Sequence, residues 1–422
     1  MAATALEWLL GFSDPALGVG WNPRASYAAK WRLGRMRALL ALAGHPDERM
    51  RVVLIAGTKG KGSTAAFLAW ILHASGTSAG LFTSPHLQTY RERVRVDGAL
   101  LSETDFTRAI DDLRPLVARL RRLHPDAGEP TTFELTLLLA MRAFAARGCA
   151  VAVVEVGLGG RIDATNALDP VVSVVTSVSY DHTAILGRTL AAIATEKAGI
   201  VRRGRPALVA VQRPAAARAI HRVSRSAGAQ VRVVRPLDVH TDLGLSGDHQ
   251  RQNAAVAVAA ARALGIDERA AARGLRMTSW PARFERVRGR PAFVLDGAHN
   301  GASAEALART LRHERGGRRL VFVLGVARDK DARAVVQPLV HIASAIIATR
   351  SASPRAADPS AVARAAARGA RAPVTTAPDV PAALAAARRL AGPDGLVCVA
   401  GSLALVAEAR TALGLVPSER WW

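Results

Sequence analysis

Cysteine, lysine and aromatic residues are scarce in this sequence, and each shortage narrows what the protein can be. The two cysteines, Cys149 and Cys398, each lie in an apolar run typical of a buried strand. Two such residues make no disulfide framework, which suits a reducing cytoplasm, and no cysteine–histidine group has the spacing of zinc ligands. No apolar run reaches the ~18 residues of a membrane span, and MAATALEWLLGF lacks the basic lead of a secretory signal. We therefore expect a cytoplasmic protein that does not bind a membrane.

The net charge of +23 allows two interpretations. A basic surface could attract nucleic acid or a small polyanion, or the charge could be a bias of composition. The arginines are scattered among alanines, and no basic run is interleaved with aromatic residues, so we expect no nucleic-acid binding. Lysine is kept at Lys30, Lys59, Lys61, Lys197 and Lys330. In a chain that otherwise uses arginine, a retained lysine points to chemistry that needs an ammonium group or a free amine.

A chain of 422 residues is expected to form two domains. We place the boundary near residue 286, after the break at 280–282, which gives domains 1–285 and 286–422. Apolar strands that alternate with helices predict an α/β fold with a parallel sheet. In the first domain we expect helical structure in 1–50, strands at 52–56, 79–83, 150–156 and 171–177, and helices at 100–123, 131–146, 190–199 and 249–264. In the second we expect strands at 292–295, 320–324, 345–348 and 396–400, and a helix from Ser303.

The segment 51–72 predicts a phosphate-binding loop. A buried strand is followed by a turn with three glycines, 57–62, and then by a helix. The backbone N–H groups of such a turn converge on an anion, and the helix N-terminus adds its partial positive charge. Lys61 offers a charge for the β- and γ-phosphates, and Ser63 and Thr64 offer hydroxyl groups for magnesium. Because the spacing departs from G-x-x-x-x-G-K-[ST], a glycine-rich turn without a ligand stays open.

Four polar loops directly follow strands and would share the carboxyl edge of one sheet, where ligands of parallel sheets bind. They are 57–63, 84–87, 155–166 and 181–183. Glu155 ends a buried strand, where an unpaired carboxylate is costly. It therefore either binds magnesium, which prefers hard oxygen ligands, or forms an ion pair such as one with Arg161.

Four further residues have both a functional and a structural interpretation. His182, after a strand, is a metal ligand or a residue of the core or of a helix cap. Lys197 follows Glu196 on a helix, where the ordinary interpretation is a solvated surface pair. Asp296 and His299, in the loop DGAHN, bind a ligand or form a helix cap and an ordinary turn.

In their order along the chain, these motifs resemble the folylpolyglutamate synthase/dihydrofolate synthase family, within the ATP-dependent Mur-type ligases. The resemblance runs from about Leu33 to Leu405. The motifs that carry it are AGTKGKGST (56–64), TSPHL (83–87), RERVRVDG (91–98), TTFELT (131–136), EVGLGGRIDATN (155–166), SYDHTAILG (179–187), ATEKAGI (194–200), HQRQNAAVAVAA (249–260), ARFE (282–285), DGAHN (296–300), RDKDA (328–332) and GSLALV (401–406).

The resemblance implies that ATP is bound between a P-loop, parallel-sheet N-terminal domain and a smaller, Rossmann-like C-terminal domain. It implies that ATP converts a carboxylate of dihydropteroate or of a reduced folate into an acyl phosphate, which the amine of L-glutamate attacks. It also implies magnesium, with two sites.

The resemblance further assigns residues to these ligands. Those that match nucleotide contacts are Thr58, Gly60, Lys61, Gly62, Ser63, Thr64, Asn253, Arg283, Asp296 and His299. Those that match the metal sites are Ser63, Ser84, Glu155, His182 and Lys197, the last as a carbamylated lysine. The implied catalytic residues are Lys61, Glu155, His182 and Lys197. The substrate-binding segments, which line the pterin site, contain Ser84, Phe133, Ile162, Asp163 and Ala164.

The sequence departs from the family at three places. Lys59 stands where the family usually has asparagine, so its ammonium either tightens phosphate binding or points to solvent. The family's G-L-x-R-M is RLGRM at 32–36, which puts pterin contacts of that segment in doubt. Gly301 stands where proline is common, which would loosen the start of the following helix.

Two other functions stay open. Another Mur-type amino-acid ligase is disfavoured by TTFELT and RIDATN, and a non-catalytic P-loop nucleotide-binding protein is disfavoured by Lys197 and DGAHN. We expect a monomer. The sequence does not decide between dihydrofolate synthesis and extension of the glutamate tail, although RIDATN favours a bifunctional enzyme.

Overall fold

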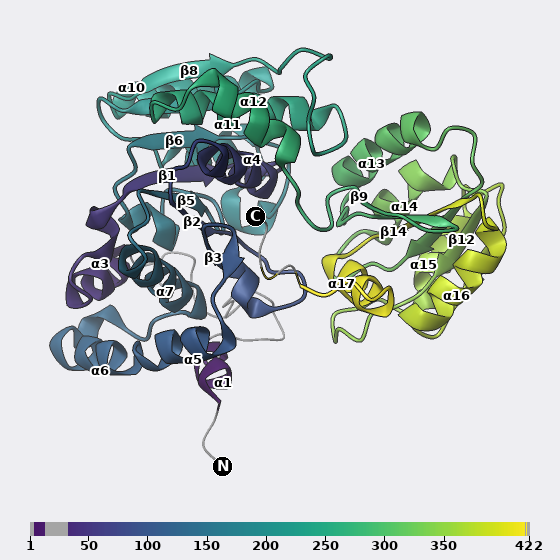
Figure 1. The fold of residues 1–422 in the computed structure, drawn as a ribbon, viewed down its shortest axis with the longest axis horizontal. Coiled ribbons are helices and arrows are strands. Elements are labelled where there is room, and N and C mark those ends of the chain that lie inside the picture. The colour runs from purple at the N-terminus through teal and green to yellow at the C-terminus, as the bar shows by residue number, and fades with distance from the viewer. Residues whose placement is uncertain (1–3, 13–32, 418, 420–422) are drawn as a thin grey trace.

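The computed structural model describes residues 4–12, 33–417 and 419, which form two α/β domains that Figure 1 shows as two lobes. The strands of the first domain are β1 (Arg51–Ala56), β2 (Ala79–Phe82), β3 (Val94–Val96), β4 (Ala99–Leu100), β5 (Val151–Glu155), β6 (Val172–Val175), β7 (Pro206–Ala210) and β8 (Gln230–Val234). Within the described residues they form one sheet in the order β4-β3-β2-β5-β1-β6-β7-β8. The pairing is parallel from β2 to β8, whereas β3 and β4 add antiparallel strands at one edge.

Helices cover both faces of this sheet because successive strand residues point to opposite sides and both sides are apolar. Val52 and Leu54 pack on the side of α3, α5, α6 and α7, whereas Val53 and Ile55 pack against α4, α11 and α12. The α-helices are α1 (Ala5–Leu10), α3 (Leu33–Leu42), α4 (Lys61–Ala74), α5 (Glu103–Asp111), α6 (Arg114–Leu123), α7 (Thr132–Ala146), α8 (Thr183–Leu186), α9 (Leu190–Ala198), α10 (Pro214–Ser226), α11 (His249–Ala263) and α12 (Glu268–Met277). Short 3₁₀ helices are η2 (Pro46–Arg49), η3 (Tyr90–Arg93), η4 (Pro125–Ala127) and η5 (Ala164–Ala167).

The second domain has its own sheet and its own core. Its strands are β9 (Glu285–Val287), β10 (Ala292–Leu295), β11 (Leu320–Leu324), β12 (Ala345–Ala348), β13 (Val374–Thr376) and β14 (Leu396–Ala400). They follow the order β13-β12-β11-β14-β10-β9, and only β9 is antiparallel to its neighbour in this described sheet. The helices are α13 (Gly301–Glu314), α14 (Ala332–Val340), α15 (Pro359–Ala367), α16 (Val380–Ala391) and α17 (Leu403–Ala412). The first three pack on one face and the last two on the other.

The predicted helix 100–123 is wrong, because the structure divides it into β4, α5 and α6. Pro115 lies in the first turn of α6, and α5 ends at Asp111, four residues earlier. Proline lacks the N–H for an internal helical bond and clashes with the carbonyl four residues before it, which favours a break between α5 and α6, although Pro338 is accommodated inside α14. Between residues 201 and 248, for which no element was predicted either way, the structure contains β7, α10 and β8.

Other expectations differ only at their ends. The predicted helical segment 1–50 contains α1, α3 and η2, and its residues 13–32 lie outside the described part of the chain. The helix expected from Ser303 begins at Gly301. The four predicted strands of the second domain have the predicted bounds.

Strands β2, β5, β1 and β6 are parallel neighbours, so their carboxyl ends lie at one edge of the sheet. The four polar loops predicted to share an edge follow these four strands, and this prediction is confirmed. The order of the strands alone therefore brings together the side chains that we expected to bind ligands.

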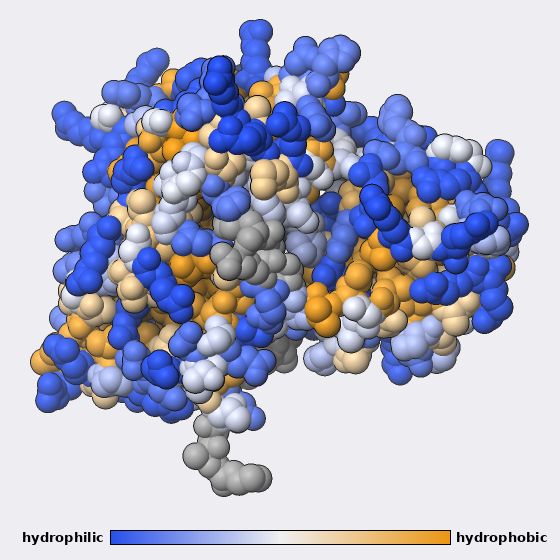
Figure 2. Space-filling view, in the orientation of Figure 1, coloured by the Kyte–Doolittle hydropathy of each residue, from blue (hydrophilic) through white to orange (hydrophobic). Residues whose placement is uncertain are grey.

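Hydrophilic side chains are spread over both domains on the face drawn in Figure 2, with apolar surface between them. Throughout the described ranges, no helix combines the length and the apolar character that crossing a bilayer requires.

Candidate active site

The loop between β1 and α4 is built to leave backbone N–H groups available. Gly60 precedes α4 with φ 88°, and a Cβ there would collide with the side chain of Asn253, so only glycine fits. Thr58 and Lys59 donate their N–H groups to the carbonyl of Ser177 at 2.8 and 3.3 Å, which fixes the loop against the end of β6. Gly60 has no side chain to cap the first turn of α4, so the N–H groups of that turn can bind an anion.

Lys61 and Glu155 meet at the carboxyl edge of the sheet. The Lys61 Nζ atom is 3.8 Å from Glu155 Oε1, and the N–H of Ser84 donates to Glu155 Oε2 at 3.0 Å. Burial raises the pKa of Glu155, although the Lys61 charge and the Ser84 N–H oppose this rise. The alternative ion pair with Arg161 is wrong, because Arg161 pairs with Glu196 at 2.8 Å.

Lys197 is buried, so its interpretation as half of a solvated pair with Glu196 is also wrong. Only 5% of the residue is exposed, and its Nζ donates to the carbonyl of Gly57 at 3.0 Å. Burial, reinforced by the charge of Lys61, lowers the pKa of Lys197 to about 7. A substantial fraction of this amine is therefore neutral at neutral pH, under the phosphate loop itself.

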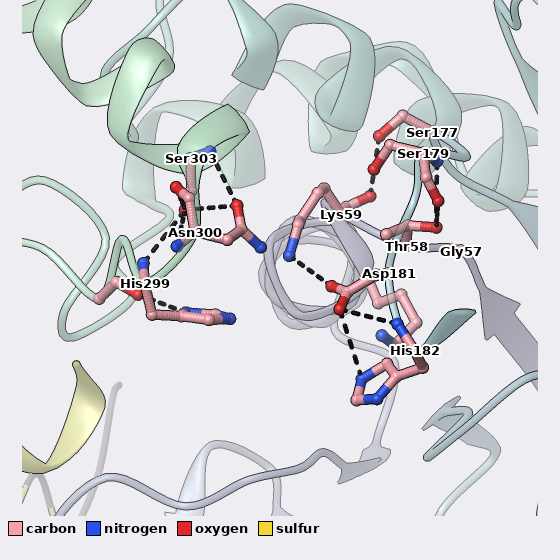
Figure 3. A network of polar contacts seen from close by, with 12 residues as sticks. Gly57, Thr58, Lys59, Ser177, Ser179, Asp181, His182, His299, Asn300 and Ser303 are labelled. Atoms are coloured by element: carbon pink, nitrogen blue, oxygen red, sulfur yellow. Dashed lines mark hydrogen bonds and ion pairs between the residues drawn. The ribbon is translucent and has the colours of Figure 1, made fainter. Parts of the chain in front are cut away.

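His182 is neither a core residue nor a helix cap that uses its side chain. It precedes α8 with φ 49°, it makes no cap hydrogen bond through its ring, and 49% of its side chain is exposed. Desolvation and the charges of Lys330, Lys197 and Lys61 lower its pKa, against the attraction of Asp181. The charge of Lys61 thus acts on both His182 and Glu155. Figure 3 shows it beside Asp181 at the end of β6.

The second domain contributes the loop after β10. Asp296 accepts hydrogen bonds from the N–H groups of Phe284 and Ala298, both at 2.8 Å. Its interpretation as a helix cap is wrong, because Asn300 caps α13 by accepting from Ser303 N at 3.0 Å. This cap begins the helix at Gly301, so the missing proline is compensated.

His299 and Arg283 lie beside this loop. The Nδ1 atom of His299 is 2.8 Å from the carbonyl of Gly297, and burial lowers the pKa of His299 to about 4. The charge of Arg283 acts on Glu155, Asp296 and His299, so this arginine lies between the two domains' polar loops.

Helix α11 supports the phosphate loop from the side. Asn253 donates to Gln250 Oε1 at 2.9 Å, and Gln250 Nε2 is 3.4 Å from the hydroxyl of Ser63. The hydroxyl of Thr64 is 3.5 Å from the carbonyl of Asn253. Sequence reasoning missed Gln250, which lies three positions before Asn253 on the same face of the helix.

The segments assigned to the pterin site hold one another in place. Asp163 is buried and accepts from Leu158 N at 2.8 Å and from the hydroxyl of Thr165 at 2.5 Å, which fixes the loop after β5. Ala164 is buried beside it and Ile162 is half-buried. Phe133, on α7, packs edge-to-face on Phe82 with ring centroids 5.5 Å apart.

Arg35, in the divergent segment 32–36, is buried against Glu134. Its Nε is 2.9 Å from Glu134 Oε2, and Glu134 also accepts from the N–H of Thr131 at 2.7 Å as part of the cap of α7. This arginine is therefore used to hold α3 on α7.

A cleft between the domains joins these parts. It is lined by, among others, Gly62, Ser84, Glu155, Arg283, Leu403 and Arg410. Arg410 contacts Glu285 and donates to Gln88 Oε1 at 2.8 Å, so α17 of the second domain holds the loop that follows Ser84. Sequence reasoning missed Gln88 and Arg410, because no local pattern links residues 322 positions apart.

The donors for a divalent cation come from several elements. No group of three or more His, Cys, Asp or Glu side chains gathers as a metal site in the ranges that the structure describes. Oxygen donors are nevertheless available from Glu155 and from the hydroxyl of Ser63, which is only 4% exposed in the first turn of α4. Such hard oxygen donors suit magnesium, which keeps several of its waters.

The comparisons with known proteins agree with this fold and site. Residues 55–235 match the family model "Mur ligase middle domain", and residues 282–403 match "Mur ligase, glutamate ligase domain". The chain therefore belongs to the Mur ligases. It is 36% identical to the dihydrofolate synthase/folylpolyglutamate synthase of Bacillus subtilis over 353 residues, which are 76% of this chain and 82% of that protein. Within the Mur ligases it thus belongs to the folylpolyglutamate synthase/dihydrofolate synthase family, and the predicted family and fold are confirmed.

Solved structures are similar over almost the whole chain. E. coli FolC in complex with DHPP and ADP has 29% identity and a TM-score of 0.84, and the match covers 98% of both chains. The bifunctional folylpolyglutamate synthase/dihydrofolate synthase of Yersinia pestis complexed with AMPPNP and a Mn ion has 28% identity and a TM-score of 0.82, covering 98% of this chain and 99% of that one.

Proposed function

We propose that this chain joins L-glutamate to dihydropteroate, to the glutamate tail of a reduced folate such as tetrahydrofolate, or to both, at the expense of ATP and through an acyl phosphate. The observation that carries the proposal is the meeting of Lys61 and Glu155, 3.8 Å apart, where Glu155 and Ser84 line a cleft between the two domains. The names of the similar proteins, and the nucleotide and DHPP bound in two of them, support the choice of substrates.

ATP is proposed to bind across the two domains. The loop residues Thr58, Gly60, Lys61, Gly62, Ser63 and Thr64 would hold the phosphates, and Asn253, Arg283, Asp296 and His299 would contact the rest of the nucleotide. The available N–H groups of α4 and the half-buried Lys61 favour a polyphosphate there. The neutral His299 ring, whose pKa is about 4, can accept or donate a hydrogen bond without adding charge.

Magnesium would be held by Ser63, Ser84, Glu155, His182 and a modified Lys197. The buried Glu155 carboxylate fits a cation, because its surroundings make an uncompensated charge costly. When bound, the metal would supply Lewis-acid stabilisation of phosphate charge.

We propose that Lys197 is carbamylated. Its neutral amine would attack carbon dioxide, forming an N–C bond and losing one proton, which leaves an anionic carbamate. A pKa of about 7 supports this reaction, since an ordinary lysine is almost fully protonated at neutral pH. The carbamate would replace an ammonium by a carboxylate-like ligand beside the phosphate loop.

The chain's own residues would then act mainly by position and charge. A carboxylate is a poor acyl donor, so transfer of the γ-phosphoryl group to it precedes attack by the glutamate amine. Both steps gather negative charge at phosphate, where Lys61 stabilises it. Phe133, Ile162, Asp163, Ala164 and Ser84 would position the pterin and the acceptor carboxylate. Closure of the cleft between the domains would keep water from the acyl phosphate.

The test is ADP release with dihydropteroate or with tetrahydrofolate, each with and without L-glutamate. We expect ADP release that depends on both the folate substrate and glutamate. Release with dihydropteroate would indicate dihydrofolate synthesis, and release with tetrahydrofolate would indicate extension of the glutamate tail. A nucleotide-linked muropeptide precursor is the control. Release with that precursor alone would identify another Mur-type ligase, and nucleotide binding without release from any substrate would identify a non-catalytic binding protein.

We further propose that the domains are 1–285 and 286–422, and that the chain acts as a monomer in the cytoplasm. The second sheet begins with β9 at Glu285, which supports the boundary. The two free cysteines are both buried, which suits a reducing compartment.

A further inference from the structure

Lys59 is the residue of the phosphate loop that the family resemblance leaves without a role. Its backbone is fixed on both sides to the end of β6. The Lys59 N–H donates to Ser177 O at 3.3 Å, and the Lys59 carbonyl accepts from the hydroxyls of Thr176 at 2.8 Å and Ser177 at 3.2 Å. Only the side chain is free to change its partner.

In this structure that partner is Asp181. The Lys59 Nζ is 2.9 Å from Asp181 Oδ2, and the two side chains are 28% and 19% exposed. At this distance the ammonium of Lys59 and the carboxylate of Asp181 form a direct ion pair. Figure 3 shows the Lys59 side chain pointing at Asp181, with His299 and Asn300 of the second domain on its other side.

The pair lies among more positive charge than it can neutralise. Burial lowers the pKa of Lys59, and the charges of Lys61 and Lys330 lower it further against the attraction of Asp181. The charges of Lys59 and Lys330 likewise add to the effect of burial in lowering the pKa of His299. In the described part of the chain, Lys330 has no ion-pair partner. Like charges are held together here from two domains, which favours a dense anion in the space between them.

We propose that Lys59 is a second phosphate-binding lysine of this loop, which exchanges Asp181 for a nucleotide phosphate when ATP binds. The inference rests on the nucleotide site of the proposed function. The exchange costs little, because the loop backbone need not move and one charged partner replaces another. Asp181 acts as a stand-in anion that keeps the ammonium neutralised and aimed at the site while it holds no nucleotide. An asparagine at position 59 could not make this exchange, since it carries no charge.

A double-mutant cycle between Lys59→Asn and Asp181→Asn tests the exchange, with isothermal titration of ATP, ADP and adenosine in the presence of magnesium. Lys59→Arg is the matched control that keeps the charge. We expect Lys59→Asn to lower the affinity for ATP about tenfold, the size of one charge-assisted hydrogen bond. The affinity for ADP should fall less, and the affinity for adenosine should not change. Asp181→Asn should raise the affinity for ATP, and this gain should disappear in the Lys59→Asn background.

Three outcomes would overturn the proposal. If Asp181→Asn lowers the affinity for ATP as much as Lys59→Asn does, the ion pair only stabilises the loop. If Asp181→Asn raises the affinity for ATP equally in both backgrounds, Asp181 acts on the phosphates directly. If Lys59→Asn lowers the affinity for adenosine as much as that for ATP, Lys59 does not act on phosphate. Thermal unfolding of each variant identifies folding defects. Because binding is measured without folate or glutamate, failure of the ligase assay leaves this test intact.

Discussion

Lys61 and Glu155 face each other across 3.8 Å, and the charge of Lys61 opposes the rise in the pKa of Glu155 that burial causes. We expect Lys61→Ala and Glu155→Gln each to lower kcat by at least about two orders of magnitude, the cost of removing one main charge-stabilising group. The measurement is ADP release with saturating substrates. Glu129→Gln, which alters an exposed carboxylate paired with Arg121, is the control and should keep full activity. Near-normal turnover by either variant would contradict the catalytic role proposed for the Lys61–Glu155 pair.

The carbamylation proposed for Lys197 can be tested by substitution and by mass measurement. Lys197→Ala should lose most activity, and a small carboxylate such as acetate should restore part of it, because the cavity left under Gly57 can hold a replacement anion. Intact-mass measurement of the wild-type protein under bicarbonate should show an added mass that the variant lacks. Absence of rescue together with an unmodified mass would count against the carbamate.

His86 makes the stability of the fold depend on pH, and its hydrogen bond with Arg93 fixes the direction of that dependence. Arg93 Nε donates to His86 Nδ1 at 3.1 Å, so the ring must be neutral, and burial followed by the Arg93 charge lowers its pKa from 6.5 to about 4. Between pH 6.5 and about pH 4 the unfolded state therefore binds more protons at His86 than the folded state does. His86 therefore contributes stability above pH 6.5 that is lost as the pH falls towards 4.

Urea unfolding at pH 7.5 and pH 5 measures this contribution. The His86→Gln variant should lose less stability between the two pH values than the wild type does. His341→Gln, at an exposed position, should behave like the wild type. An unchanged pH dependence in His86→Gln would show that His86 does not carry the effect.

At the scale of elements, the start of α4 depends on the absence of a side chain at Gly60. Gly60→Ala would force an alanine to φ 88° and into the side chain of Asn253 on α11. Gly76→Ala, also at positive φ but with open space around it, costs only the strain of about 1–2 kcal/mol. Titration with ATP should show at least tenfold weaker binding for Gly60→Ala and near-normal binding for Gly76→Ala. Equal binding by the two variants would contradict a close fit between the loop and α11.

Elements with a strong local pattern could be predicted from the sequence. The apolar runs 320–324 and 396–400 form buried strands with these bounds, and the glycines of 57–62 lie in the turn between β1 and α4 and at the start of α4. Orientation could not be predicted in the same way. Adjacent Glu196 and Lys197 on α9 point to opposite sides, one to Arg161 and the other to Gly57, because tertiary packing decides which side of α9 faces the loop. The break at Pro115 could have been predicted from proline's missing N–H.

On the scale of the whole molecule, Arg410 of α17 joins the domains through Gln88 of the first domain, and it also contacts Glu285 of β9 within its own domain. Only 5% of its side chain is exposed. We expect Arg410→Met to lower kcat/KM for glutamate-dependent ADP release about tenfold, because the loop that follows Ser84 would lose its support from α17. The affinity for ATP should change much less. Arg389→Met, at an exposed position of α16, is the control and should leave both unchanged.

Calorimetry provides a second measurement for Arg410→Met. Removing one partner of a buried ion pair leaves the other carboxylate without compensation, so the unfolding temperature should fall. Wild-type unfolding temperature and activity in this variant would mean that the domains are held together elsewhere.

The carbamate proposed at the buried amine of Lys197 would have a practical consequence. A residue that became useful only after taking up dissolved carbon dioxide would make specific activity a property of the buffer as well as of the polypeptide. Preparations that are degassed, acidified or stored under argon would regain turnover slowly after transfer to carbonate-containing medium, and this lag would be mistaken for damaged protein unless the headspace were controlled.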